Sequence, residues 1–161
     1  MTMILDGSAG VTFPNSTVQA SAGVVLQVVS STIATVYSTT STSFVASGMS
    51  ASITPKFSTS KILVLATIGV GQATNGSSAG GAIALYRNST ALQSPQTYQN
   101  FINTAASANP RLLASINYLD SPSTTSSVAY NIYFASYSGA NAWQLNEASN
   151  GSTITLLEIA G

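Results

Sequence analysis

The feature that most constrains this chain is the apolar run at residues 60–71, SKILVLATIGVG. In a β-strand, alternate side chains point to opposite faces. The even-numbered positions 62–70 would line one face, whereas Leu63, Leu65 and Thr67 would line the other, so neither face has the polar pattern of a wet surface. The run is shorter than the about 20 residues that a membrane-spanning helix needs, and its β-branched residues favour a strand. We therefore predict a strand that is covered on both sides.

The second constraint is the scarcity of charge. Charged residues make up 5% of the 161 residues, where a soluble domain carries about 25%. The polar surface must come mainly from 27 Ser and 19 Thr residues, which solvate a surface but repel nothing. A hydrophobic content of 45% and a mean hydropathy of +0.30 favour a globular domain over disorder. We therefore expect the chain to bury surplus apolar surface against copies of itself, with a homotrimer as the prediction and a dimer or hexamer left open.

Composition also excludes several functions. Four scattered Lys and Arg residues cannot neutralise a phosphate backbone, which argues against nucleic-acid binding. No segment has the length and charge pattern of a transmembrane helix or a signal peptide, so we expect no membrane insertion. The chain lacks His and Cys, and its four carboxylates are far apart in sequence. We interpret Asp6 and Asp120 as turn caps and place Glu158 in the last strand. The sequence thus predicts no enzyme, no catalytic residues, no cofactor and no metal site.

The chain divides into an N-terminal arm, residues 1–22, and a β-domain, residues 23–161. The arm has small apolar clusters separated by turn residues and cannot form a core alone. We predict that it anchors the chain to another protein, although a hairpin folded onto its own domain is an alternative. The predicted anchoring residues are Ile4, Leu5, Val11, Phe13 and Val18.

From residue 23, short apolar or alternating runs are separated by turns rich in Ser, Thr, Gly and Pro. We interpret Ser30-Ser31 as a turn and Gly48 as a break between two strands; residues 93–109 could form a short helix or a surface loop. The fold prediction is all-β, a jelly-roll-like antiparallel β-sandwich with a short N-terminal arm. The predicted strands are 24–29, 33–37, 43–45, 49–53, 60–71, 81–87, 91–92, 111–119, 128–137, 142–147 and 152–159.

Two sets of residues are candidates for contacts with other molecules. The predicted subunit interface combines residues from the strands that are apolar or aromatic on their second face: Leu63, Leu65, Tyr133, Tyr137 and Leu157. The second set is aromatic residues near amides, a combination that suits a glycan on a host surface: Tyr98, Phe101, Asn141 and Trp143. For Trp143, packing in the core is the alternative.

Four stretches carry a resemblance to a known group of proteins. Residues 4–19 (ILDGSAGVTFPNSTVQ) are similar to the short N-terminal segment of tailed-phage fibre and virion-surface proteins. Residues 52–68, 117–124 and 153–160 resemble the C-terminal β-domains of the same proteins. The resemblance implies a trimeric structural component on the virion surface, whose arm docks on another virion structural protein. It transfers no catalytic residue. No fibre shaft is recognisable, which leaves open a short tail or baseplate fibre or a capsid decoration protein.

Overall fold

The computed structural model describes residues 4–6, 10–12, 18–19, 24–72, 80–92, 98–99, 111–137, 141–146 and 151–161. For residues 4–6, 10–12, 18–19 and 98–99 it describes backbone pairing only. All the regular elements among these residues are strands, and every strand pair is antiparallel. Within the described ranges, no helix is long and apolar enough to cross a membrane.

The first sheet of the sandwich has four columns of strands. Its order is β4 (Val25–Ile33), β14 (Ser152–Ile159), β7 (Lys61–Gln72) and β11 (Arg111–Asp120). Two short strands, β5 (Tyr37–Thr39) and β13 (Trp143–Leu145), continue the columns of β4 and β14. The long strand β7 pairs with β14 through its first half and with β13 through its last residues. The predicted apolar run is therefore a central strand of this sheet.

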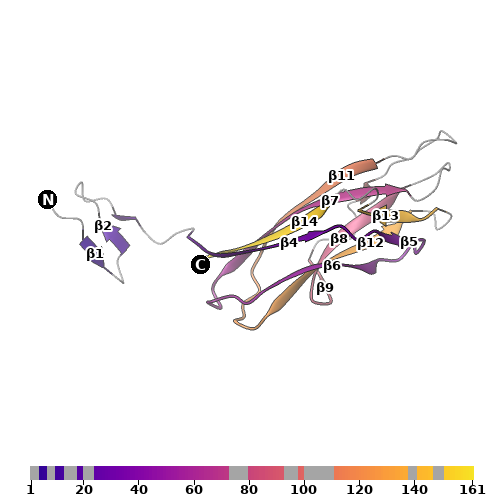
Figure 1. Ribbon diagram of the computed structural model, residues 1–161. Helices are drawn as coiled ribbons and strands as arrows, with labels where there is room; N and C mark the ends of the chain where they lie inside the picture. The colour runs from indigo at the N-terminus through magenta and orange to yellow at the C-terminus, as the bar shows by residue number, and fades with distance from the viewer. Residues whose placement is uncertain are drawn as a thin grey trace.

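The second sheet lies against the first (Figure 1). Its order is β6 (Val45–Ile53), β12 (Val128–Ser136), β8 (Gly81–Arg87) and β10 (Tyr98–Gln99). The short strand β9 (Thr90–Ala91) pairs back onto β8.

The order of the strands is that of a jelly roll. When β4 with β5 is counted as the first column and β13 with β14 as the eighth, one sheet reads 1-8-3-6 and the other 2-7-4-5. From one column to the next, the chain changes sheet at every connection except the one between β8 and β10. This alternation wraps the two sheets around one core, and it confirms the predicted all-β sandwich.

The core lies between the sheets and is filled by alternate residues of each strand. In β7 the even-numbered residues are buried, and in β12 the residues from Val128 to Phe134 alternate in the same way. The largest fully buried side chains come from both sheets: Trp143, Tyr130, Met49, Ile53, Ile62, Ile68, Leu85, Ile132, Leu145, Ile154, Leu156 and Gln72. Two-residue periodicity thus gave the correct inward face for the long strands.

Two predicted interruptions are wrong, and each has a structural reason. Ser30 and Ser31 do not turn the chain, because they pair with Thr155 and Ile154 inside β4. Gly48 does not end a strand either; it lies within β6 at a φ of +80°, next to a shift in register against β12. A Cβ atom at this position would lie 2.9 Å from the Tyr37 ring, so glycine fits both the backbone and the space.

The N-terminal residues contain three short strands, β1 (Ile4–Asp6), β2 (Gly10–Thr12) and β3 (Val18–Gln19), which form a sheet of their own. Ile4, Leu5, Val11 and Val18 lie in these strands, whereas Phe13 lies outside the described residues. The anchoring role of the arm stays a prediction. Of the segment 93–109, only Tyr98 and Gln99 are described, and they form β10.

Candidate interaction surfaces

The outer face of the first sheet carries four aliphatic side chains in one row, which we call the aliphatic row: Val28, Leu157, Leu63 and Leu119. The backbone registers place Leu119 opposite Leu63, Leu63 opposite Leu157, and Leu157 opposite Val28. Val28 is 58% exposed and Leu119 50%, while the two central leucines are half-buried. Direct cross-strand neighbours are about 5 Å apart at Cβ. The row is therefore a continuous apolar band across four strands.

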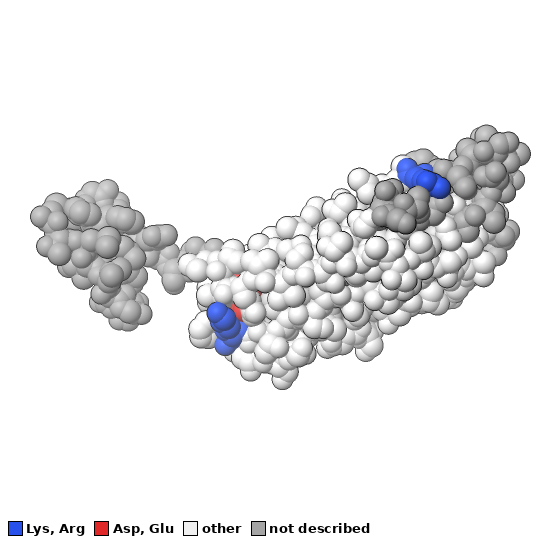
Figure 2. All heavy atoms as spheres, viewed as in Figure 1, with Lys and Arg blue, Asp and Glu red and all other residues white. Residues whose placement is uncertain are grey.

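Beside the aliphatic row lie two further rows of mostly polar, uncharged side chains. The next row has Asn117, Leu65, Thr155 and Ser30 in register, and the row after it has Ser115, Thr67, Thr153 and Thr32. Leu65 is 37% exposed, so the prediction that β7 is covered on both faces does not hold within one chain. On the outer face of β7 and β11, the charges are Lys61 and Arg111, at the strand ends. Figure 2 likewise shows Lys and Arg atoms only near the two ends of the sandwich.

The outer face of the second sheet is different, because it carries tyrosines in place of aliphatic residues. The rings of Tyr86 and Tyr133 are stacked, with centroids 3.8 Å apart and planes inclined by 20°. Asn131 lies opposite Tyr86 on β8 and opposite Ser50 on β6. The predicted interface residues therefore do not share one face: Leu63, Leu65 and Leu157 lie on the first sheet and Tyr133 on the second. Tyr137 follows β12 and is 50% exposed.

Trp143 is not at the surface, which corrects its selection as a surface contact. It is 1% exposed and belongs to the core cluster, as the alternative interpretation had it. Its Cγ and Cδ1 atoms lie directly over Gly81, where no Cβ atom would fit. Among the described residues, neither the indole nitrogen nor the side-chain amide of the neighbouring Gln72 has a hydrogen-bond partner. Asn141 is half-buried, and its backbone carbonyl accepts a hydrogen bond from Ser136 Oγ at 2.7 Å. The Tyr98 side chain and Phe101 lie outside the described residues.

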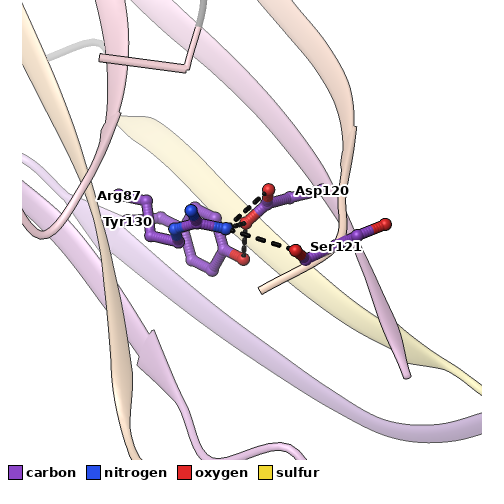
Figure 3. Close-up of polar contacts among 4 residues, drawn as sticks. All are labelled: Arg87, Asp120, Ser121 and Tyr130. Atoms are coloured by element: carbon purple, nitrogen blue, oxygen red, sulfur yellow. Dashed lines mark hydrogen bonds and ion pairs between the residues drawn. The ribbon is translucent and has the colours of Figure 1, made fainter. Parts of the chain in front are cut away.

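A buried polar cluster joins the two sheets at the end of β11 (Figure 3). Arg87 Nη1 lies 2.9 Å from Asp120 Oδ1 and 3.0 Å from Oδ2, and the Tyr130 hydroxyl donates to Asp120 Oδ2 at 2.7 Å. Burial, followed by the hydrogen bond to Asp120, raises the pKa of Tyr130, which keeps this hydroxyl protonated. Asp120 was predicted to cap a turn; its carboxylate instead accepts bonds from two strands of the other sheet. The cluster thus links β11 of the first sheet to β8 and β12 of the second.

Glu158 is the second buried carboxylate, and it forms a hydrogen bond with the loop between β6 and β7. It is 0% exposed, accepts a hydrogen bond from Gln27 Nε2 at 2.6 Å and another from the Lys56 backbone N–H at 2.7 Å. Burial by itself raises the pKa of this carboxyl. The Ser60 hydroxyl, the Gln27 amide and the backbone N–H groups of Lys56 and Phe57 more than compensate, so the pKa lies below its ordinary value. No metal-binding group of three or more His, Cys, Asp or Glu residues occurs in the described part of the chain.

We expect acid to destabilise the fold through Glu158. Because its pKa is lower in the folded chain, the ionised form contributes stability above the unfolded-state pKa of about 4.5, and this stability is lost as the pH falls through the folded value. Urea unfolding between about pH 6 and about pH 3 measures the effect. The Glu158→Gln variant should be less stable at the upper pH and should lose less stability on acidification. An equal pH dependence in both proteins would contradict this role.

The fold and surfaces define an all-β, jelly-roll sandwich domain whose outer faces, among the described residues, carry few charges. No protein-family model matches the chain, and no curated protein matches it. Among solved structures, it is similar to that of infectious bursal disease virus Gt strain (12% identity, 85% of this chain and 39% of that chain, TM-score 0.44). It is also similar to that of the Gx strain (16%, 84% and 37%, 0.39) and to dimeric latent PorU from Porphyromonas gingivalis (10%, 88% and 14%, 0.38). The chain thus spans less than two fifths of each of these three chains.

Proposed function

We propose that this chain is a structural virion component of a tailed phage, a short tail or baseplate fibre whose β-sandwich forms a homotrimer displayed for attachment to the host surface. The observation that carries the proposal is the aliphatic row on the outer face of the first sheet. A protein that worked as a monomer would expose this band to water at a cost of about 25 cal/mol per Å². The row therefore favours a function in which copies assemble.

The size of this face is adequate for assembly. Four strands spaced about 4.8 Å apart, each presenting about eight residues of about 3.3 Å rise, cover about 500 Å². Two such faces bury about 1,000 Å², which is the threshold for a specific interface. The Ser and Thr rows beside the aliphatic row carry no charge, so identical copies meet without repulsion. Around a three-fold axis, which the resemblance to virion-surface proteins favours, the face of each subunit is divided between its two neighbours.

The proposal that the chain is not an enzyme rests on the same structure. Both buried carboxylates of the described chain, Asp120 and Glu158, are held by hydrogen bonds within the protein. Their partners come from neighbouring strands and a loop, and they give each carboxylate a role in joining parts of the fold. Carboxylates that join parts of the fold are compatible with a protein whose function is assembly.

The oligomeric state tests the proposal. We expect the full chain to have three times the 16.4 kDa subunit mass in light scattering and sedimentation. The Leu63→Lys variant places a charge in the middle of the aliphatic row, and we expect its trimer to dissociate at least about tenfold more readily, with unchanged circular dichroism. Phe57→Lys is the matched control, because Phe57 is 56% exposed in the loop between β6 and β7. A 16.4 kDa species at all concentrations, or equal effects of the two substitutions, would refute the proposal.

The placement on the particle separates the fibre from a capsid decoration protein. The capsid decoration protein is the second candidate, because the sequence resemblance extends to virion-surface proteins of both kinds. Gold-labelled antibodies on intact phage particles should mark the tail or baseplate with few copies per particle if the fibre proposal is correct. Labelling spread over the whole head would instead assign the chain to the capsid coat, where it would stabilise the shell.

A further inference from the structure

The outer face of the second sheet is the surface that the proposed self-association leaves free. Its outward positions on β6, β12 and β8 include Ser50 and Ser52, Asn131 and Tyr133, and Tyr86. No outward residue of these three strands is charged, and none is a large aliphatic residue. This face therefore lacks the apolar band that favours contact between copies on the first sheet.

The stacked tyrosines form the centre of this face, and we call Tyr86, Tyr133, Asn131 and Ser50 the tyrosine platform. Tyr133 lies in register with Ala84 on one side and Ala46 on the other. Because both neighbours are small, no bulky side chain flanks the ring within that row. Tyr86 lies in register with Asn131, and Asn131 with Ser50, so an aromatic ring, an amide and a hydroxyl follow one another across three strands.

The polar groups of the platform are held in place. Asn131 Nδ2 donates to the Asn88 carbonyl at 3.0 Å, and Asn88 Oδ1 accepts from the Ala129 backbone N–H at 3.1 Å. Asn88 itself adopts a positive φ of 53° in the turn between β8 and β9. These bonds fix the amide of Asn131 beside Tyr86. A fixed amide next to a rigid ring pair presents donors and acceptors at little cost in entropy.

We propose that the tyrosine platform binds a neutral carbohydrate. A pyranose ring offers an apolar C–H face, which packs on aromatic rings, and hydroxyl groups, which match the hydroxyl and amide groups beside them. The outward residues of β6, β8 and β12 provide no cation for an acidic sugar and no anion for an amino sugar. The inference deepens the proposed attachment role, since it names the class of ligand that the exposed face of the fibre would take. The inference assigns Tyr133, a predicted residue of the subunit interface, to a ligand site instead.

Titration by ¹H–¹⁵N NMR of the full chain tests this proposal with two neutral probes, maltohexaose and cellohexaose, and one acidic probe, hexagalacturonate. We expect saturable shifts with a neutral probe, largest at Asn131, Tyr133 and Tyr86. Tyr133→Ala should weaken binding at least about tenfold. Tyr133→Phe, which keeps the ring and the fold, should retain most of it. Tyr137→Ala is the matched control and should change binding less than about twofold, because Tyr137 is equally aromatic but lies beyond the strand.

The outcomes separate this inference from the proposed function. Absence of saturable shifts with both neutral probes, tighter binding of hexagalacturonate, or an equal loss in Tyr137→Ala would each overturn the carbohydrate proposal. Light scattering on the same samples reports the trimer independently. A trimer without sugar binding would refute only the platform, and sugar binding by a monomer would refute only the assembly.

Discussion

The Asp120→Ala variant is expected to lose about 3–4 kcal/mol of folding free energy. The substitution removes the acceptor for the Tyr130 hydroxyl, which is fully buried, and the partner of the Arg87 guanidinium. Removal of one member of a buried ion pair costs about 3–5 kcal/mol. The value should lie toward the lower part of that range, because the Arg87 side chain is 28% exposed and can regain water.

Two comparisons make this result specific. Tyr130→Phe removes only the hydroxyl and leaves the ion pair, so it should cost about 1 kcal/mol. The double variant should cost less than the sum, since both substitutions remove the same hydrogen bond. Urea unfolding at one fixed protein concentration gives the free energies, because association makes stability depend on concentration. A loss below about 1 kcal/mol for Asp120→Ala would show that the cluster does not hold the sheets together.

The second large effect is expected at Gly81, where Gly81→Ala should cost about 3 kcal/mol or prevent folding. The added Cβ atom would overlap the Trp143 indole ring and lie 2.6 Å from the Ala135 carbonyl oxygen. The carbonyl belongs to β12, which pairs with β8 at this point, and Trp143 is buried. Neither neighbour can move without breaking the ladder or the core, so the strain cannot be relieved locally.

Gly151→Ala is the control for this substitution. A Cβ atom at Gly151 would meet only the Thr32 Cγ2 atom at 3.4 Å, so we expect a change within about 1 kcal/mol. Replacing Trp143 by Leu in the Gly81→Ala background should recover part of the loss, because the smaller side chain leaves room for the methyl group. Thermal and urea unfolding measure all three proteins. Equal stability of Gly81→Ala and Gly151→Ala would show that the contact with Trp143 is not close in solution.

The sequence located most of the strands, but it could not place the polar residues correctly. Asp120 precedes Ser121-Pro122, a pattern typical of a turn cap, and nothing near it in the chain indicates Arg87 or Tyr130. For Glu158 too, nothing nearby in the chain indicates the partners, because Gln27 and Lys56 lie far away in sequence. One signal was available: a carboxylate inside an apolar strand such as STITLLEI needs a buried partner. It does not say which partner.

The two outer faces illustrate the same limit. Alternation showed that Leu63 and Tyr133 each lie on the side of a strand opposite to the core. Alternation does not show that these sides belong to different sheets. For this reason the sequence predicts both residues in one interface. Trp143 gave a similar error, because the amides around it suggest a binding surface, whereas the ring fills the space above Gly81.

By itself, the sequence determined that this chain forms strands, which residues of a long strand share one face, and that the chain carries few charges. These are local properties, since the pleat alternates side chains every residue regardless of what lies beside the strand. Only the tertiary structure decided that Val28, Leu63, Leu119 and Leu157 stand in one row, and that Tyr86 stacks on Tyr133. Cross-strand neighbours depend on which distant segments share backbone hydrogen bonds, and residue-to-residue spacing along the chain does not encode that choice.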